Sequence, residues 1–243
     1  MNQAIQVRNL IKIFNKNIRA VDGISFDVYE NEIFGLLGSN GSGKSTTLRM
    51  LSTVLEPTSG KITFKGTDHN RNKIRNTIGY IPQQDLLYED LSVTDNLRLF
   101  SRSYNLSDEQ RIQRIEYLLK KLELTKYRGY FAGDLSGGYK KRLSIAIALL
   151  HNPKIIIADE ITIGLDPDLR HKIWSLLLEL KKEASIIFTT HYLEEAEKLC
   201  DRIALMNLGK ILVCGKPQEI IKKNECNTLE DVFHKLVTNK RKK

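Results

Sequence analysis

Polar and hydrophobic positions alternate in the first third of the chain, with the period of a half-buried strand. The alternation is partial over residues 6–13 and clean over 24–28, and short apolar runs follow at 32–37 and 61–64. Successive side chains of a strand point to opposite faces, so this pattern predicts strands. The run at 32–37 leads directly into a glycine-rich loop. The first third is therefore expected to be rich in β-structure.

The middle of the chain changes to the spacing of helices. Between Asp108 and Leu122, apolar residues recur every three or four positions, which is the pattern of an amphipathic helix. Ser107 and Asp108 suit the cap that begins such a helix. Residues 94–104 show a weaker helical pattern. The apolar residues that the helix over 108–122 is expected to turn toward the core are Ile112, Ile115, Leu118, Leu119 and Leu122.

Strands and helices alternate from Lys154 onward. The run Ile155–Ala158 is apolar without alternation, as in a parallel strand covered on both faces. A helix over 168–182 and a strand over 185–190 follow, so the whole order predicts an α/β core with a helical insertion at 84–150. The helix is expected to bury Ile173, Trp174, Leu177 and Leu178. The remaining predicted elements are helices near 193–199 and 229–237 and strands at 202–206 and 210–213.

The composition is that of an ordinary globular protein. Of 243 residues, 41% are hydrophobic and 28% are charged, which argues against disorder, collagen-like repeats and small disulfide scaffolds. The longest apolar run, Ile145–Leu150, has six residues, whereas a membrane-spanning helix needs about 20. The first residues lack the pattern of a signal peptide. Three scattered cysteines, Cys200, Cys214 and Cys226, suit a reducing, cytoplasmic setting.

The charge is less informative than the pattern. The chain carries 38 Lys and Arg against 29 Asp and Glu, a net charge of +9. Such an excess can mark a nucleic acid or an anionic membrane as the partner, but it also occurs on solvated surfaces. The second interpretation is favoured, and no nucleic-acid partner is expected. The dense basic run at 240–243 is expected to be a frayed tail.

The glycine-rich segment Gly38–Ser45 matches the pattern G-x-x-x-x-G-K-S, the P-loop. Its glycines let successive backbone N–H groups curl around phosphate oxygens, and the following helix directs its positive end at the same anion. Lys44 is placed to reach the β- and γ-phosphates, and Ser45 to offer its hydroxyl to Mg²⁺. We therefore predict a nucleotide site made of Gly38, Ser39, Asn40, Gly41, Ser42, Gly43, Lys44, Ser45 and Thr46.

A second apolar strand ends in two carboxylates, Asp159 and Glu160. At the carboxyl edge of a parallel sheet, Asp159 would lie beside the P-loop and hold Mg²⁺. Glu160 is then placed to polarise the attacking water as a general base. Two solvated acids at a strand end are the alternative, which the presence of a P-loop makes the weaker one. The predicted cofactors are therefore ATP and Mg²⁺.

A second anion-binding pattern lies between the P-loop and this strand, where Ser136 and two glycines stand at a predicted helix start. Free N–H groups, a helix dipole and a hydroxyl together suit an anion, although Ser-Gly-Gly alone would be an ordinary turn. One helix ahead of the strand that ends at Asp159, this segment resembles the signature motif of the ABC ATPase family. The resemblance implies that the motif acts in trans, on the ATP of a second subunit. Its residues are Leu135, Ser136, Gly137, Gly138 and Tyr139.

Further segments resemble other motifs of this family. Ile78–Gln83 is similar to the Q-loop, which implies that Gln83 contacts Mg²⁺ and the attacking water. Phe188–His191 is similar to the switch region, which implies that His191 contacts the γ-phosphate. The family resemblance also assigns a D-loop to Gly164, Leu165 and Asp166. Together the motifs imply catalytic roles for Glu160, His191, Gln83 and Lys44, and metal contacts for Ser45, Gln83 and Asp159.

Phe14 falls where the family places an aromatic ring under adenine, with a place in the sheet core as the alternative. Two other positions depart from the family pattern. Tyr139 stands where the signature motif has Gln, or Met in some exporters, and anion binding is expected to survive because its groups precede this residue. Ile161 replaces the proline of Asp-Glu-Pro-Thr, which removes a rigid element and is expected to loosen the loop that aims Glu160.

The resemblance spans residues 7–237 and is closest to the ATP-binding subunits of multidrug, antibiotic and polysaccharide exporters. It implies an α/β fold: a P-loop NTPase core with an antiparallel β subdomain and an inserted α-helical subdomain. The implied activity is ATP hydrolysis that powers an ABC transporter through closure of a head-to-tail dimer. The predicted single domain is 1–237, with core and β subdomain at 1–83 and 151–224, helical subdomain at 84–150, C-terminal helix at 225–237 and a basic tail at 238–243.

The partners follow from the same resemblance. A homodimer or a paired ATPase subunit is implied, together with a separate transmembrane permease that keeps the chain at the inner face of the cell membrane. The family docks this permease just after Gln83, at residues 84–89. Leu86, Leu87 and Tyr88 would form an apolar contact there if they are exposed, and the alternative is that the helical insertion buries them.

Two other function classes remain open from the sequence. A soluble ABC-type ATPase of translation or DNA repair would explain the net charge, but such proteins usually carry two ATPase units or a long coiled coil. A non-transport assembly ATPase, such as those of iron–sulfur cluster biogenesis, has a similar length. An inactive binding module is disfavoured, because Lys44, Asp159, Glu160 and His191 are all present.

Overall fold

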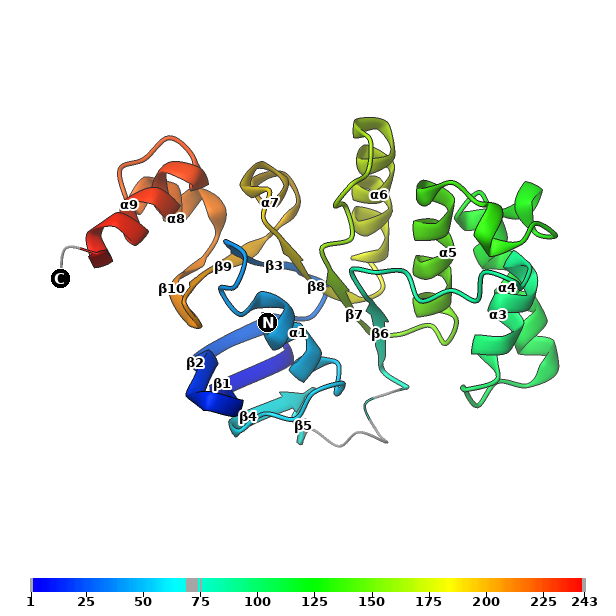
Figure 1. Cartoon of the computed structure of the whole chain (residues 1–243), viewed down its shortest axis with the longest axis horizontal. Coiled ribbons are helices and arrows are strands. Elements are labelled where there is room, and N and C mark those ends of the chain that lie inside the picture. The colour runs from blue at the N-terminus through cyan, green and yellow to red at the C-terminus, as the bar shows by residue number, and fades with distance from the viewer. Residues whose placement is uncertain (1, 69–73, 75, 242–243) are drawn as a thin grey trace.

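The computed structural model describes residues 2–68, 74 and 76–241, and Figure 1 shows two sheets with helices packed around them. The smaller sheet is antiparallel, in the order β2-β1-β4-β5. A single 3₁₀ turn at Asn15–Asn17 joins its two long strands. This sheet is the predicted antiparallel β unit. Its strands are β1 (Gln3–Phe14), β2 (Ile18–Tyr29), β4 (Ser59–Phe64) and β5 (Thr67–Asp68).

The larger sheet has six strands in the order β10-β9-β3-β8-β7-β6. The pairs from β9 to β6 are parallel, and β10 runs antiparallel to β9. The strand β6 was not predicted, because its segment was assigned to a loop motif. The strands are β3 (Ile33–Gly38), β6 (Ile78–Ile81), β7 (Ile155–Asp159), β8 (Ser185–Thr190), β9 (Arg202–Asn207) and β10 (Lys210–Gly215).

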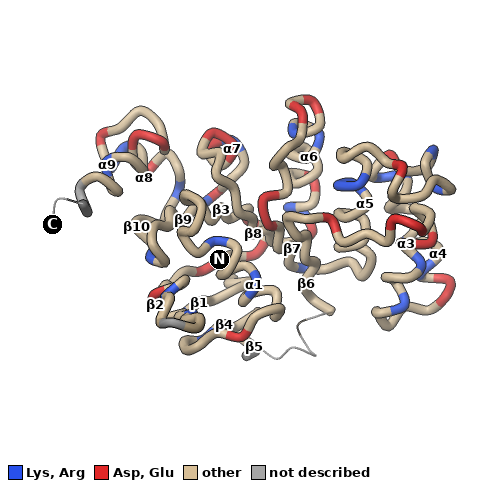
Figure 2. Tube along the Cα trace, in the orientation of Figure 1, with Lys and Arg blue, Asp and Glu red and all other residues tan. Residues whose placement is uncertain are grey.

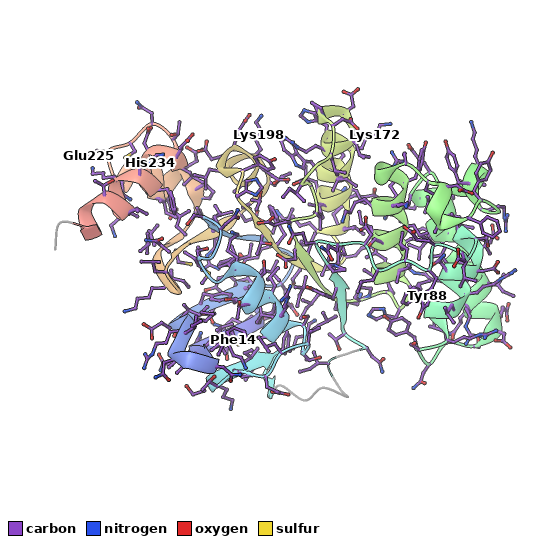
Figure 3. All side chains as sticks on the ribbon, viewed as in Figure 1. Phe14, Tyr88, Lys172, Lys198, Glu225 and His234 are labelled. Carbon is purple, nitrogen blue, oxygen red and sulfur yellow. The ribbon has the colours of Figure 1, made fainter. Side chains whose placement is uncertain are left out.

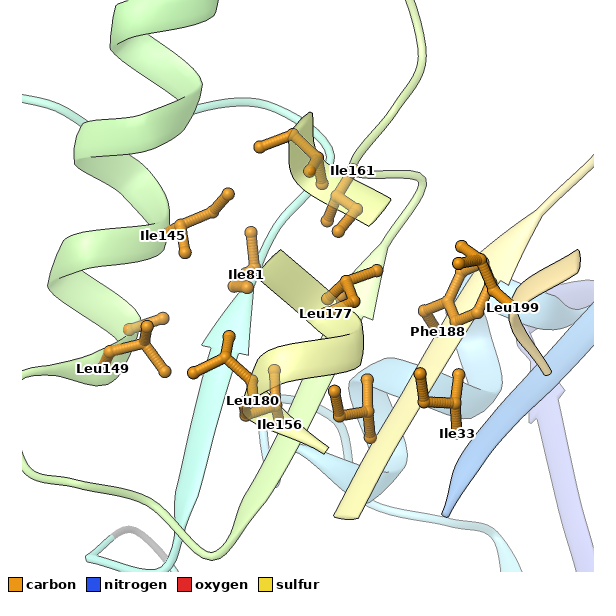
Figure 4. Close-up of a cluster of buried hydrophobic side chains, with 14 of the residues drawn as sticks. Ile33, Ile81, Ile145, Leu149, Ile156, Ile161, Leu177, Leu180, Phe188 and Leu199 are labelled. Atoms are coloured by element: carbon orange, nitrogen blue, oxygen red, sulfur yellow. The ribbon is translucent and has the colours of Figure 1, made fainter. Parts of the chain in front are cut away.

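The parallel sheet separates two hydrophobic cores, and alternate side chains of its strands enter each one. Helix α1 (Lys44–Leu51) packs between the two sheets, where it meets Ile155 and Ile157 of β7 in one core. Ile156 and Ala158 of the same strand point into the other core, among the remaining helices. Figure 4 shows part of this second core. The apolar run without alternation therefore belongs to a strand covered on both faces, as predicted.

The remaining helices cover the other face of the parallel sheet and extend it at one end (Figure 1). Helices α3 and α4 pack with α5 beyond the β6 edge, and α6 lies between this group and α7. Helix α8 was not predicted. The helices are α3 (Val93–Ser101), α4 (Asp108–Lys121), α5 (Gly137–Leu149), α6 (Pro167–Leu180), α7 (Leu193–Leu199), α8 (Pro217–Lys223) and α9 (Leu229–Arg241).

The start of α4 and the end of α9 can be compared with the bounds predicted from the sequence. Ser107 caps α4 through a complete capping box with Gln110, which confirms the predicted helix start. Helix α9 begins at Leu229 and continues to Arg241, so residues 238–241 extend the helix beyond the predicted bounds of 225–237. Among the described helices, none is long and apolar enough to cross a membrane.

Two side chains predicted to face inward are exposed instead. Ile112 is 64% exposed, because no residue of α4 before Ile115 is buried and the neighbours cover only the later turns of the helix. Leu178 is 46% exposed. The buried strip of α6 runs through Ile173, Leu177 and Leu180, and Trp174 at its margin is half-buried. Leu178 lies one position outside this strip and points away from the core.

Charged residues of both signs are interspersed over most elements, as Figure 2 shows. Many are joined in ion pairs at the surface, such as Arg8 with Asp27 at 2.6 Å and Lys121 with Glu179 at 2.9 Å. Paired charges of opposite sign are typical of a solvated surface, and the meaning of the basic excess stays a prediction.

Adjacent residues of α6 allow a direct test of the core assignment. Leu177→Ala is expected to lower the free energy of unfolding by about 2–5 kcal/mol, because Leu177 is buried in the second core. Leu178→Ala should change it by about 0.5 kcal/mol or less, because that side chain is already exposed. Urea denaturation followed by circular dichroism measures both. Equal losses in the two variants would contradict the assignment.

Candidate functional site

The P-loop connects the end of β3 to the start of α1, in the middle of the parallel sheet. Two of its glycines are required by close contacts as well as by backbone angles. Gly43 has φ +104°, and a Cβ there would lie 2.4 Å from the carbonyl oxygen of Ala20. Gly38 has φ +152°, and a Cβ there would lie 2.3 Å from the carbonyl oxygen of Met206. The loop therefore keeps a tight curvature, which allows successive backbone N–H groups to face the same anion.

The ammonium group of Lys44 is buried beside this loop. Its Nζ donates to the carbonyl oxygens of Gly38, at 2.8 Å, and Ser39, at 3.2 Å. It also lies 3.8 Å from Oε1 of Glu160. Burial lowers the pKa of Lys44, while the carboxylates of Glu160 and Asp159 act in the opposite direction. A phosphate in the loop would supply the further negative charge that a desolvated ammonium favours.

Hydroxyl and carboxylate oxygens gather at the end of β7. Ser45 Oγ donates to Oδ1 of the buried Asp159 at 3.0 Å, and Thr189 Oγ1 donates to the same oxygen at 2.6 Å. Oxygen donors of this kind suit Mg²⁺, which binds through one or two protein groups when phosphates provide further ligands. The described residues contain no cluster of three or more His, Cys, Asp and Glu side chains for a metal. Ser45 and Asp159 by themselves fit the small protein share of such a magnesium site.

Glu160 lies at the meeting point of several strand ends. Its backbone has φ +46°, and its N–H donates to Thr189 Oγ1 at 3.0 Å. Gln83 Nε2 donates to Oε2 of its carboxylate at 3.3 Å, and His191 Nδ1 lies 3.7 Å from Oε1. The side chain of Glu160 is buried. A carboxylate held in this way can accept a proton from a water molecule that approaches a phosphate in the P-loop.

These groups surround one cavity of about 520 Å³. It contains most of the predicted nucleotide and catalytic residues and adds two that were not predicted, Ala20 and Ile163. Asp159 lies buried beside it, through its bond to Ser45. The lining residues are Ala20, Asn40, Gly41, Ser42, Gly43, Lys44, Ser45, Thr46, Gln83, Glu160, Ile163 and His191.

Phe14 is not among the residues that line this cavity. It ends β1 at the rim of the antiparallel sheet (Figure 3). Its side chain is 43% exposed, so its alternative assignment to the sheet core is wrong. The ammonium of Lys12 lies 5.3 Å from the centre of its ring. An exposed aromatic ring is available for stacking, and contact with a base stays a prediction.

The predicted signature segment lines a different cavity, of about 640 Å³. Ser136 is the N-cap of α5, and both it and Gly137 are exposed. The D-loop residues lie in the same cavity, whereas Leu135 is buried in the core. Gln83 and Ile163 line both cavities. The other lining residues of this second cavity that belong to the predicted motifs are Gly138, Tyr139, Gly164, Leu165 and Asp166.

The two departures from the family pattern have defined environments. The ring of Tyr139 packs on Tyr127, with centroids 4.1 Å apart, and Arg142 lies 5.3 Å from its centre. This packing holds the phenol against the helical part of the molecule, beside the N-terminus of α5. Ile161 is buried in the second core (Figure 4), so its side chain anchors the loop that was expected to be looser.

Thr189 is a site residue that the sequence reasoning missed. Its hydroxyl donates to Asp159 and accepts from the Glu160 N–H, and so joins the two acidic residues. The parallel register pairs Asp159 with Thr189, which brings the hydroxyl alongside. The sequence does show a hydroxyl residue at the end of the predicted strand 185–190. It does not show that this strand lies beside the one that ends at Asp159, because strand order is not visible in the sequence.

Comparison with known proteins identifies close relatives. The family model described as ABC transporter matches residues 21–163. The Nod factor export ATP-binding protein I of Cupriavidus metallidurans is 40% identical over 224 residues, which cover 91% of this chain and 74% of that protein. A solved ATP-binding subunit of an ABC transporter has a TM-score of 0.87 at 29% identity, over 96% of this chain and 99% of that one. A dimeric ATP-binding cassette in a post-hydrolysis state, bound to ADP and Pi, has a TM-score of 0.79 at 30% identity, over 87% and 98%.

Two glycines of the loop provide a test of its nucleotide site. Gly41 and Gly43 both have positive φ, but a Cβ on Gly41 would meet no atom within 4 Å. The left-handed angle costs about 1–3 kcal/mol in either alanine variant. Gly43→Ala adds the clash with Ala20, so its Mg-ATP affinity should be lower than that of Gly41→Ala by roughly tenfold or more. Titration calorimetry measures this difference, and equal affinities would contradict the geometric argument.

Proposed function

Because this chain belongs to the family of ABC transporter ATP-binding subunits, we propose that its P-loop cavity hydrolyses Mg-ATP and powers export by a transporter. The observation that carries the proposal is the convergence of Lys44, Gln83, Glu160 and His191 on that cavity, from four separate segments of the chain. ATP binding and hydrolysis are the activity of the family.

The phosphate chain of ATP is held by the P-loop N–H groups and by Lys44. The ammonium lies between the loop carbonyls and Glu160, where it meets the β- and γ-phosphates when they enter. Ser45, Asp159 and Gln83 are the residues that would hold Mg²⁺. When bound, this ion neutralises charge on the β- and γ-phosphate oxygens.

Hydrolysis requires a water molecule in line with the γ-phosphate. We assign Glu160 as the base that accepts a proton from this water while its oxygen bonds to the γ-phosphorus. The bond from the γ-phosphorus to the bridging oxygen breaks, and ADP leaves with that oxygen. Gln83 fixes the Glu160 carboxylate through the bond of 3.3 Å, and His191, whose Nδ1 lies 3.7 Å from that carboxylate, is the residue that we assign to contact the γ-phosphate. The pairing orients the base before the nucleotide arrives.

A dimer accounts for the two separate cavities. The exposed N-terminus of α5, with Ser136 and Gly137, offers anion-binding groups outside the P-loop cavity of its own chain. A second ATPase subunit in head-to-tail orientation would bring its own signature segment onto the nucleotide. The similar ADP- and Pi-bound cassette is dimeric, which supports this arrangement. We propose that ATP closes the dimer and that hydrolysis reopens it.

We propose that residues 84–150 form a helical subdomain. A transmembrane permease is the partner that fits the groove beside this subdomain. This groove of about 490 Å³ lies between the turn after α1, β6, α3 and α5 and is lined largely by apolar groups. Leu86 is 69% exposed at its edge, Tyr88 is exposed (Figure 3), and Leu87 is half-buried against the core. Exposed apolar side chains around a groove suit a protein contact. The similarity to a Nod factor export ATP-binding protein supports export. We propose that the permease holds the chain at the inner face of the cell membrane.

The assignment of the general base predicts the behaviour of one variant. Glu160→Gln should bind Mg-ATP and accumulate as an ATP-bound dimer, with hydrolysis slower by roughly 100-fold or more, because the amide cannot accept the proton. Phosphate release and size-exclusion chromatography measure the two effects. Glu109→Gln, on the exposed side of α4, is the matched control and should hydrolyse ATP normally. Full hydrolysis by Glu160→Gln would exclude Glu160 as the base.

The docking groove makes a separate prediction. Leu86→Arg should reduce the amount of a multi-span membrane protein that copurifies with the tagged chain from solubilised membranes of its source organism. A charge in the apolar groove disfavours the contact, and the ATPase activity of the isolated chain should not change. Ile112→Arg is the control, because Ile112 is equally exposed on the helical subdomain but lies outside the groove. Equal copurification of both variants would argue against this surface.

A further inference from the structure

A buried carboxylate lies behind the catalytic loops. Glu195 in α7 is only 1% exposed. Its Oε1 accepts a hydrogen bond of 2.6 Å from Trp174 Nε1, and its Oε2 accepts one of 3.0 Å from Thr162 Oγ1. A carboxylate is costly to bury unless its oxygens are bonded, and here both oxygens have a donor. The group is therefore held in one position by two partners.

These partners connect three segments that carry proposed site residues. Thr162 lies two positions after Glu160, in the loop that leaves β7. Trp174 belongs to α6, which begins directly after the D-loop, with Asp166 as its N-cap. Glu195 belongs to α7, which follows His191. The Glu195 side chain thus links three segments. They are the loop that contains Glu160 and Thr162 (the base loop), the helix α6 after the D-loop, and the helix α7 after His191.

The loop after Glu160 has a particular need for such a link. Glu160 is a non-glycine residue at φ +46°, a conformation that persists only when its surroundings hold it. Position 161 is isoleucine, which lacks the ring that locks φ at about −65° in proline. Burial of Ile161 fixes one side chain of the loop, and the bond from Thr162 to Glu195 fixes the next.

We propose that Glu195 is a positioning residue that aims the Glu160 carboxylate by holding Thr162. This inference rests on the proposed role of Glu160 as the base. Because Glu195 also binds Trp174, any displacement of the base loop changes the hydrogen bonding of that indole. Trp174 is the only tryptophan of the chain, and Lys198 of α7 (Figure 3) lies 5.6 Å from its ring centre. Its fluorescence therefore reports the state of this link.

The test compares variants of Thr162 with the same hydroxyl removed or retained. Thr162→Val should lower kcat for ATP by roughly tenfold or more with a change in KM below about twofold, because binding groups are untouched and only the base is misaimed. Thr162→Ser keeps the donor and should restore kcat to within about twofold of the parent protein. Thr63→Val is the matched control, since Thr63 is also buried and donates to Gln6, at 3.2 Å, in the antiparallel sheet.

Trp174 emission supplies a readout that does not depend on turnover. Thr162→Val should shift it and Thr63→Val should not. Glu195→Gln is expected to keep most activity, because its carbonyl accepts from Trp174 and its amide can donate to the Thr162 hydroxyl. Trp174→Phe, which keeps an aromatic ring but removes the other donor, should also lower kcat with KM little changed. Thr162→Ala removes the same hydroxyl as Thr162→Val, leaves Trp174 in place as the emission probe, and replaces Thr162→Val if that variant does not fold.

Several outcomes would overturn the inference. They are an unchanged kcat in Thr162→Val, an equal loss in Thr162→Ser, and a lowered kcat without any change in Trp174 emission. The result for Glu160→Gln separates this inference from the function on which it rests. If that variant loses turnover while Thr162→Val retains it, the positioning role fails and the base assignment stands.

Discussion

The parallel register of the central sheet is the constraint on which the site depends. Strands β6, β7, β8 and β3 all run in the same direction, so their carboxyl ends meet at one edge. Four loops leave that edge and carry in turn Gln83, Glu160, His191 and the P-loop. None of these residues is near another in sequence except within its own motif. Backbone hydrogen bonds between strands, rather than contacts among the polar side chains, bring the chemical groups together.

The same sheet explains why the polar site is stable although it is buried. Each parallel strand sends alternate side chains into two separate cores, which hold it on both faces. The buried polar groups at the strand ends then satisfy one another: Thr189 donates to Asp159 and accepts from the Glu160 backbone. A residue such as Lys44 is desolvated there in advance, which lowers its pKa and prepares it for an anion. The packing of the sheet therefore stabilises the arrangement of these buried polar groups before the nucleotide binds.

The two departures from the family pattern are accommodated by packing. Tyr139 packs on Tyr127 and so lies against the helical part of the chain, while the N-terminus of α5 remains exposed. Ile161 replaces a residue that would have restricted the backbone, but it is buried in the core. Together with the bond from Thr162 to Glu195, this burial gives the loop an anchor through side chains. The expected loosening of the Glu160 loop considered only the backbone and omitted these tertiary contacts.

Local patterns in the sequence determined the P-loop, the acidic strand end, the family and most of the elements, because turns, caps and periodicity depend on neighbouring residues. They were less successful where burial depends on distant segments: Ile112 and Leu178 fit their helical spacing but face solvent, and Phe14 is not a core residue. Strand β6 and the role of Thr189 also required the order of the strands. That order, the separation of the two cavities and the link through Glu195 arise from contacts between residues far apart in the chain, which only the tertiary structure decides.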